Sequence, residues 1–337
     1  APHFARWLQR QGLPVGAGPV RTTLDARLQR LARSALQAQL AELQGHGVED
    51  GAVLVLDNAS GAVRAWVGSS GPALSDAPAV DAVLARRQPG STLKPFVYLL
   101  AFEQYLLTPA SLLHDAPADL DGGAGAFMPR NYDRRYRGWV SARTALASSL
   151  NVPTARVAEL IGPEPLFDRL DAFGLGLAES GGFHGLALAL GSADVTLLHL
   201  TNAYRSLALG GQWSAVRGLA NAVERPPAMR RVADARAVFQ VTDILADASA
   251  RAATFGLDSA LVTRGFAAVK TGTSKDMRDN WCIGFTDRYT VGVWVGNASG
   301  APMHDVSGVS GAAPVWRSLM QALHAQRPSR APAVPNG

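Results

Sequence analysis

Cysteine and lysine are both scarce in this sequence of 337 residues. The one cysteine, Cys282, excludes an intramolecular disulfide framework and a zinc site built from several cysteines. Because Cys282 lies in a strongly apolar stretch, we predict a buried, unreactive thiol. Only three of the 32 basic residues are lysines, namely Lys94, Lys270 and Lys275. Arginine carries nearly all of the positive charge, so the few positions that keep lysine are informative.

The sequence also lacks long apolar runs and dense clusters of charge. Its longest apolar run, residues 96–107, is interrupted by Glu103 and Gln104 and is too short to span a bilayer. The net charge is +5, but the arginines are scattered and no aromatic ladder accompanies them, so we expect no nucleic-acid binding. The seven histidines show no metal-binding spacing. We therefore expect neither a metal ion nor another cofactor.

The composition is typical of a globular protein with a substantial core, because 47% of the residues are hydrophobic and 18% are charged. Residues 1–22 contain several prolines and glycines, and we predict a linker or lead-in from a missing upstream domain. Residues 23–326 then form one domain. The proline- and alanine-rich residues 327–337 form a tail or linker. The sequence lacks a starting Met, and we expect it to be a piece of a longer protein.

Hydrophobic patterning predicts an antiparallel sheet that is interrupted by a long helical insertion. Short apolar runs between turn residues predict strands, and hairpin connections make them antiparallel. The strand candidates are residues 52–56, 62–67, 266–273, 281–285 and 290–295. Helical periodicity predicts helices at residues 24–43, with Thr22 and Thr23 as the N-cap, and at 311–326. Residues 82–261 are also mostly helical by period, and we expect a cleft where this lobe meets the sheet.

A serine and a lysine lie three residues apart, at Ser91 and Lys94. Pro89 and Gly90 interrupt the preceding structure and Pro95 suits the first turn of a helix, so a helix should begin near Ser91. An amine one turn away can activate a serine hydroxyl if it is held neutral, which is possible for lysine but not for arginine. By itself the spacing is a weak signal, because any surface helix can carry it by accident.

Two further polar segments lie downstream. Ser149 precedes Asn151 by two residues, a pattern that by itself is more often a helix cap or a turn. The strand candidate at residues 266–273 ends in Lys-Thr-Gly-Thr, and the alternation of a strand turns Thr271 and Thr273 toward one face. The three segments together are much more specific than any one of them.

In this order, Ser-x-x-Lys, Ser-x-Asn and Lys-Thr-Gly are the motifs of the penicillin-binding proteins and serine β-lactamases, which the sequence resembles. The resemblance extends over residues 22–323. Within this family, the sequence is most similar to the transpeptidase domain of bifunctional class A penicillin-binding proteins, in particular their 1C branch. The resemblance is carried by residues 88–95, 129–132, 188–192 with 195–196, 202–204 and 306–316. The resemblance implies an α+β fold with a five-stranded antiparallel sheet, flanking helices and an inserted all-helical lobe.

The resemblance also implies a role for each motif residue. Ser91 would attack the carbonyl carbon of a terminal D-Ala-D-Ala bond, with neutral Lys94 as the general base. Ser149 would pass the proton to the leaving amine, and Asn151 would hold Lys94 and the substrate amide. Lys270 would supply fixed positive charge.

Residues of the third motif would also bind the substrate. Thr271, Gly272 and Thr273 would hold the terminal carboxylate of the stem peptide. The backbone N–H groups of Ser91 and Thr273 would form the oxyanion hole.

The family further implies a biological setting. A membrane anchor and a glycosyltransferase domain precede such a domain, which cross-links peptidoglycan stem peptides on the periplasmic side of the bacterial inner membrane and is trapped covalently by β-lactam antibiotics. A D,D-carboxypeptidase, a β-lactamase and a penicillin-sensing or scaffold domain without turnover remain as alternatives. Glu164 superficially resembles the deacylating glutamate of class A β-lactamases. It follows Ser149 too closely and opens an amphipathic helix, so we predict a helix-terminal acid.

Overall fold

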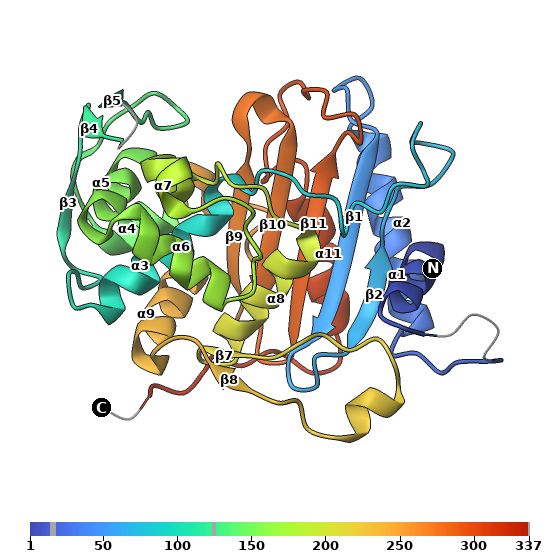
Figure 1. Ribbon diagram of the computed structural model, residues 1–337. Helices are drawn as coiled ribbons and strands as arrows, with labels where there is room; N and C mark the ends of the chain where they lie inside the picture. Colours follow the sequence, from blue (N-terminus) through green and yellow to red (C-terminus); the bar gives the residue numbers. More distant parts are fainter. Residues whose placement is uncertain (14–17, 123–125, 336–337) are drawn as a thin grey trace.

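In the computed structural model, which describes residues 1–13, 18–122 and 126–335, a five-stranded antiparallel sheet separates two groups of helices (Figure 1). Its strand order is β2-β1-β11-β10-β9. The strands are β1 (Asp50–Asp57), β2 (Val63–Val67), β9 (Ala268–Thr273), β10 (Asp279–Phe285) and β11 (Tyr289–Gly296). Val53 of β1 pairs with Val293 of β11, so strands that precede the long insertion in the sequence pair directly with strands that follow it. The five predicted strands and the predicted fold class are confirmed.

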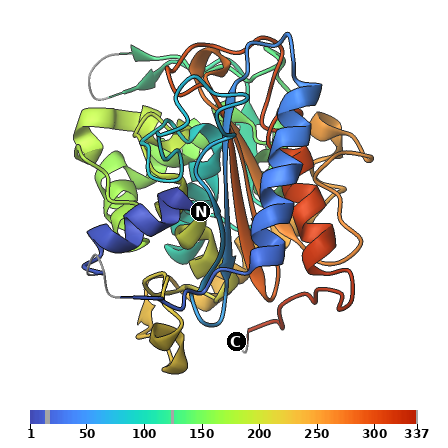
Figure 2. The ribbon, with the colours of Figure 1, turned by 90° about the vertical axis from the view of Figure 1, so that its right-hand side faces the viewer.

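Two helices cover one face of this sheet, α2 (Ala26–Glu42) and α11 (Ala313–Leu323), which lie side by side in Figure 2. Their apolar stripes meet the residues of β1 and β11 that point toward them, and Leu36, Val293 and Trp316 are fully buried there. Both helices were predicted. The N-cap of α2 differs from the prediction, because the Asp25 carboxylate accepts the N–H groups of Arg27 and Leu28.

Thr23, one of the two predicted cap residues, has a different role. Its hydroxyl donates to the carbonyl oxygen of Val63 at 2.8 Å and so joins the start of the domain to strand β2. A threonine hydroxyl and an aspartate carboxylate are both good caps, and the carboxylate adjacent to the first turn is the one that reaches the free N–H groups.

The insertion covers the other face of the sheet and is helical, as predicted. Its helices are α3 (Lys94–Glu103), α4 (Ala142–Ala147), α5 (Asn151–Ile161), α6 (Pro163–Ala172), α7 (Gly181–His184), α8 (Leu197–Ala208), α9 (Ala235–Ala246) and α10 (Ala252–Phe255), with 3-10 turns at η1 (Gly90–Leu93), η2 (Gly185–Leu190) and η3 (Asn221–Glu224). Three short two-stranded sheets add to this lobe. They pair β3 (Leu112–Asp115) with β6 (Gly138–Ser141), β4 (Leu120–Asp121) with β5 (Ala126–Phe127), and β7 (Gln212–Trp213) with β8 (Arg230–Arg231).

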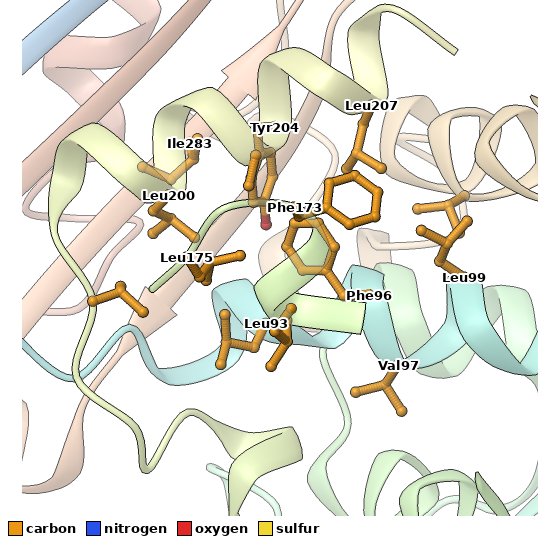
Figure 3. Close-up of a cluster of buried hydrophobic side chains, with 14 of the residues drawn as sticks. Leu93, Phe96, Val97, Leu99, Phe173, Leu175, Leu200, Tyr204, Leu207 and Ile283 are labelled. Carbon is orange, nitrogen blue, oxygen red and sulfur yellow. The ribbon is translucent and has the colours of Figure 1, made fainter. Parts of the chain in front are cut away.

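Aromatic packing fixes the helices of the insertion against the sheet. The ring of Phe96 on α3 meets Phe173 and Tyr204 edge to face, at centroid distances of 5.0 and 5.7 Å (Figure 3). The Tyr204 hydroxyl donates to the carbonyl oxygen of Thr92 at 2.7 Å, which satisfies the only polar atom of this buried ring. Helix α8 thereby holds η1, the turn that carries Ser91.

The N-terminal segment differs from its prediction. Only a linker or lead-in was expected for residues 1–22, but residues 2–10 form helix α1 (Pro2–Arg10). Its buried Trp7 stacks on Trp66 of β2 with a centroid distance of 5.0 Å. This helix is therefore part of the packed domain, whereas residues 14–17 of the predicted lead-in lie outside the described residues.

The C-terminal segment runs beside the start of β9. The Ser329 hydroxyl donates to the carbonyl oxygen of Phe266 at 2.7 Å, and Arg288 donates to the carbonyl oxygen of Arg327. Residues 336–337 of the predicted tail lie outside the described part of the chain. Within the described ranges, no helix combines the length and the hydrophobicity that crossing a membrane requires.

Candidate active site

A cavity of about 370 Å³ lies where the helical insertion meets the edge strand β9. Three segments that are far apart in the sequence form its walls, namely the turn η1, the α4–α5 junction and the end of β9. The predicted site residues that line it are Ser91, Ser149, Asn151, Thr271, Gly272 and Thr273. Lys94 and Lys270 lie buried around the same residues. The structure thus brings all of the predicted site residues together.

Ser91 lies in the 3-10 turn η1, which continues directly into α3 with Pro95 in its first turn. The predicted start of a helix is thus confirmed. Gly90 has φ +53°, and a Cβ atom there would lie 2.5 Å from the carbonyl oxygen of Thr273. Only glycine allows this conformation and this approach, so Gly90 lets the nucleophile turn pack against the end of β9.

Lys94 follows one turn later and is completely buried. Its Nζ donates to the carbonyl oxygen of Ser149 and to Oδ1 of Asn151, both at 2.6 Å, and lies 3.4 Å from the Ser149 hydroxyl. Burial lowers the pKa of Lys94 well below its usual value, and the nearby charge of Lys270 lowers it further. These conditions favour a neutral amine.

Ser149 lies between the two lysine amines. Its hydroxyl accepts a hydrogen bond from Nζ of Lys270 at 2.7 Å, while its carbonyl oxygen accepts from Lys94. The backbone of Ser149 has φ +59°, in the left-handed region that residues other than glycine seldom adopt. Such strain persists only where the surroundings enforce it, and here it turns both oxygens of one serine toward lysine amines.

The surroundings of Lys270 affect its charge. Its side chain is 3% exposed, and burial lowers its pKa to about 7. A group with this pKa is about half protonated at neutral pH, so the charge of Lys270 depends on pH and on the charges beside it. Burial also raises the pKa of Cys282 well above its usual value, so the thiol is neutral and buried, in agreement with its prediction.

The end of β9 packs closely against the turn that carries Ser91. A Cβ atom on Gly272 would lie 2.3 Å from the carbonyl oxygen of Pro89. The Thr273 hydroxyl accepts the N–H group of Gly308 at 3.1 Å, which leaves its own hydrogen available to a ligand. This close approach of the two segments is the geometry that an oxyanion hole made of the Ser91 and Thr273 N–H groups would need.

Several residues that line the cavity had no predicted role. Asn131, Asp133 and Arg137 lie on the loop before β6, and Phe255 of α10 and Val309 also line the cavity. Asn131 falls in a segment that carried the family resemblance, so a signal existed for it. Val309 also lies in such a segment, whereas Asp133, Arg137 and Phe255 lie in a loop and a one-turn helix for which periodicity gives no information.

Tyr132 follows Asn131 and also lines the cavity. Its side chain is 70% exposed, so it lies at the rim of the cleft and not in the core. An exposed aromatic ring beside a cavity can pack against a bound peptide.

Glu164 does not belong to this cavity. It lies in the first turn of α6, as predicted, and its carboxylate accepts the N–H group of Gly182 at 2.6 Å. Asp133 is the one carboxylate among the described residues that line the cavity, and it is paired with Arg137 at 2.9 Å. The described part of the cleft therefore contains no unpaired carboxylate that could activate water.

The sequence matches the family described as "penicillin binding protein transpeptidase domain" over residues 51–321. The chain belongs to this family. The transpeptidase domain is 34% identical to penicillin-binding protein 1C of Escherichia coli (strain K12) over 96% of its length and 40% of the relative's. It is 32% identical to penicillin-binding protein 1B of Vibrio cholerae over 84% of its length and 37% of the relative's. The chain thus spans about two fifths of these relatives, and its resemblance to class A penicillin-binding proteins is confirmed.

Solved structures share the fold of this transpeptidase domain. The penicillin-binding protein PonA1 from Mycobacterium tuberculosis superposes with a TM-score of 0.83 at 23% identity, covering 99% of this chain and 94% of that one. Penicillin-binding protein 1A from Haemophilus influenzae gives a TM-score of 0.83 at 17% identity, covering 99% and 72%. PonA1 has also been solved in complex with penicillin V, with a TM-score of 0.79 at 22% identity and coverage of 99% and 97%.

Proposed function

We propose that this domain is a D,D-transpeptidase of peptidoglycan synthesis that works through an acyl-enzyme on Ser91. The observation that carries the proposal is the buried amine of Lys94, placed one turn after Ser91 and hydrogen-bonded to Ser149 and Asn151. Few functions other than proton transfer need a lysine in such a position, because burying an amine without an anionic partner is unfavourable.

The first chemical step forms the acyl-enzyme. A neutral amine has two N–H bonds and one lone pair, and the two N–H bonds of Lys94 are directed to the carbonyl oxygens of Ser149 and Asn151. The lone pair is left to accept the Ser91 proton while Oγ of Ser91 bonds to the carbonyl carbon of the penultimate D-alanine. The resulting oxyanion is held by the N–H groups of Ser91 and Thr273, each worth roughly 3–4 kcal/mol in comparable enzymes.

The second part of that step expels the terminal D-alanine. Ser149 lies between the two amines and so can pass the proton taken up by Lys94 to the leaving nitrogen as the carbon–nitrogen bond breaks. The product is an ester between Ser91 and the shortened stem peptide. An amine of a second stem peptide then attacks this ester, and Ser91 recovers its proton.

Substrate recognition uses the end of β9. Thr271 and Thr273 line the cavity, and their hydroxyls would donate to the terminal carboxylate of the stem peptide. Lys270 lies beneath them with a pKa of about 7, and a bound carboxylate raises that pKa because an opposite charge favours the ammonium form. Lys270 therefore gains its full charge when the substrate arrives.

The lifetime of the acyl-enzyme separates the alternative enzymes. A β-lactamase needs a base that activates water, and the one carboxylate among the described cavity residues, Asp133, is paired with Arg137. Slow hydrolysis of the acyl-enzyme favours transfer of the acyl group to an amine. A D,D-carboxypeptidase instead transfers the acyl group to water. A penicillin-sensing or scaffold domain would form the same adduct without turning over stem peptides.

The longer relatives suggest the setting of the whole protein. We propose that the full-length chain joins this domain to a glycosyltransferase domain and a membrane anchor, and that it works on the periplasmic side of the bacterial inner membrane. We also propose that β-lactams acylate Ser91, a reaction supported by the fold shared with PonA1, which has been solved in complex with penicillin V.

Intact-protein mass spectrometry after exposure to penicillin tests the proposal. We expect one adduct that peptide mapping places on Ser91, that persists for hours and that is absent from the Ser91→Ala variant. Loss of the adduct within seconds would identify a β-lactamase. No adduct with several β-lactam classes would contradict the proposed serine mechanism. Cross-linking of lipid-linked substrate, compared with release of D-alanine alone, distinguishes a transpeptidase from a carboxypeptidase and from a sensor.

A further inference from the structure

Asn131 connects a loop of the insertion to the residues around Lys94. Its Oδ1 accepts the backbone N–H groups of Asn151 and Val152, at 2.9 and 3.3 Å. These are the first two residues of α5, whose N-terminal N–H groups have no partner within the helix. Asn131 is 4% exposed and thus caps α5 from a separate segment of the chain.

A buried carboxylate determines which way the Asn131 amide points. Nδ2 of Asn131 donates to both carboxylate oxygens of Asp115, at 2.8 and 2.9 Å, and to the carbonyl oxygen of Arg135 at 2.8 Å. Asp115 is completely buried and forms no ion pair within the described residues, although it also accepts the N–H group of Arg137. Because a carboxylate can only accept, it must face the nitrogen of the amide, and the oxygen is left for α5.

The neighbouring residue orients the side chain of Asn151. Nδ2 of Asn151 donates to the carbonyl oxygen of Arg130 at 2.7 Å, so Oδ1 is the end that faces Lys94 at 2.6 Å. Residues 130 and 131 therefore hold both the backbone and the side chain of Asn151. A shift of this loop would change the direction of one of the two hydrogen bonds of the Lys94 amine.

We propose that Asn131 is a positioning residue for the acylation of Ser91, oriented by the buried Asp115 carboxylate and acting through Asn151 on Lys94. This inference rests on the proposed serine acylation. Asp115 does not itself line the cavity but contacts the lining residue Asn131, which makes it the better residue to change, because its replacement removes no side chain that could touch the ligand.

The first test is Asp115→Asn in the whole domain, with a fluorescent penicillin as the probe. The new amide opposes Nδ2 of Asn131 with a donor, so Asn131 turns or shifts and Asn151 loses its support. We expect the acylation rate constant at saturating penicillin to fall roughly 10- to 100-fold, since misplacements of about 1 Å have effects of this size. The dissociation constant of the initial complex should change by less than about threefold, because Thr271 and Thr273, which would hold the ligand's carboxylate, are not affected.

Stability measurements separate positioning from a merely structural role. Asp115→Asn removes a buried charge that has no cation beside it, which offsets part of the cost of the altered hydrogen bonds, so the unfolding midpoint should fall no more than in a matched buried variant. Asn297 provides the matched control, because it is also 4% exposed and hydrogen-bonds to the backbone of Gly47, Glu49 and Ala301 outside the cavity. Asn297→Ala should lower stability without slowing acylation, whereas Asn131→Ala should slow acylation. A lowered midpoint with normal acylation in Asp115→Asn would overturn the proposal.

A paired exchange provides the rescue. Asn131→Asp alone places carboxylate against carboxylate and should be strongly impaired. Adding Asp115→Asn restores one donor and one acceptor across the pair, so we expect acylation to recover at least about fivefold relative to Asn131→Asp. No recovery in the double variant would contradict the orienting role of Asp115.

Amide hydrogen exchange tests the same contact without any acylation. In Asp115→Asn we expect faster exchange of the Asn151 and Val152 N–H groups, with the strands of the sheet unchanged. If the unaltered domain were not acylated by penicillin, the proposed function would fail, but amide exchange would still show whether Asp115 and Asn131 support the start of α5. Unchanged exchange at both amides would refute that support.

Discussion

The two buried lysines of the cleft differ in what their neighbours allow them to do. Lys94 donates to two carbonyl oxygens, whereas Lys270 donates to the hydroxyl of Ser149 and to the carbonyl oxygen of Thr271. Burial lowers the pKa of both amines, and neither has a carboxylate partner among the described residues. Their separate roles can be tested by replacement with arginine, which is always charged and so cannot act as a neutral base.

We expect Lys94→Arg to lower the rate of acylation by penicillin by about 10²–10⁴, since general base catalysis contributes this much. Lys270→Arg should lower it less, because a cation beside the bound carboxylate is kept. The exposed Lys275 supplies the control, and Lys275→Arg should behave like the unaltered domain. Stopped-flow measurement with a fluorescent penicillin gives all three rates. Equal losses at Lys94 and Lys270 would contradict the division of roles.

The pKa of Lys270 also predicts how stability depends on pH. The group has a pKa of about 7 in the folded protein and about 10.5 when unfolded. Between these values the unfolded chain binds more protons, so raising the pH favours the folded state, and the penalty for burying the amine is largest below pH 7. Lys270→Met removes the penalty at all pH values. The melting temperature of Lys270→Met should therefore exceed that of the unaltered domain, and this difference should shrink as the pH rises from about 7 to about 10.

Thermal unfolding at a series of pH values checks this expectation. Lys275→Met is the control, because that side chain is exposed and its replacement should give a difference that does not vary with pH. A constant difference between Lys270→Met and the unaltered domain across the range would show that Lys270 titrates normally.

Among the elements, the short turn η1 depends most on glycine contacts. Gly191, which ends η2, has φ +87°, and a Cβ atom there would lie 2.3 Å from the carbonyl oxygen of Gly90. Gly90 in turn touches the end of β9. The position of Ser91 is therefore set by three backbone segments in direct contact, which is possible only without side chains between them.

Replacement of these glycines separates backbone strain from close approach. Gly210 also has a positive φ, +63°, but has open space where a Cβ atom would lie. We expect Gly210→Ala to cost about 1 kcal/mol of stability and to leave acylation unchanged. Gly191→Ala should cost more than about 2 kcal/mol and slow acylation, because η1 must move. Chemical denaturation and penicillin acylation measure both effects, and equal behaviour of the two variants would exclude the close-contact explanation.

Elements were predictable from the sequence where local signals decide them. Pro89, Gly90 and Pro95 act within a few residues, so the helix start at Ser91 could be predicted. Helix α1 could not, because its stripe is only two turns long and its stability comes from Trp66, far along the chain. The orientation of Asn131 was equally beyond prediction, since it depends on a carboxylate in another segment.

The candidate site also combines features that the sequence predicts with features that depend on distant residues. The motif residues of the cleft could be predicted because their spacing and order are specific. The pKa of Lys270 could not, because it depends on burial by residues from several elements, and a sequence does not specify burial at single positions. The predicted fixed charge on Lys270 therefore stays a prediction, and the pH series described above tests it.

At the scale of the whole molecule, the helical insertion and the sheet share one hydrophobic core. Buried residues of α3 and α8 belong to the same cluster as Trp281, Ile283 and Trp294 of the sheet. Separating the two parts would expose that face, so neither part should be stable alone. We expect a single calorimetric transition with equal calorimetric and van't Hoff enthalpies. Two resolved transitions would show that the insertion folds independently.

The pairing of β1 with β11 has a consequence for the newly made chain. Asp57 faces Tyr289 across the sheet, so the β1–β2 hairpin acquires its second neighbour only after the whole insertion has been synthesised. At about 5–20 residues per second, that delay lasts roughly 10–50 s. During this time one long edge of β1 is open to pairing with other chains. The yield of folded domain should therefore depend on how well the exposed edge of β1 is protected during synthesis. Slower elongation should increase the fraction of chains that aggregate.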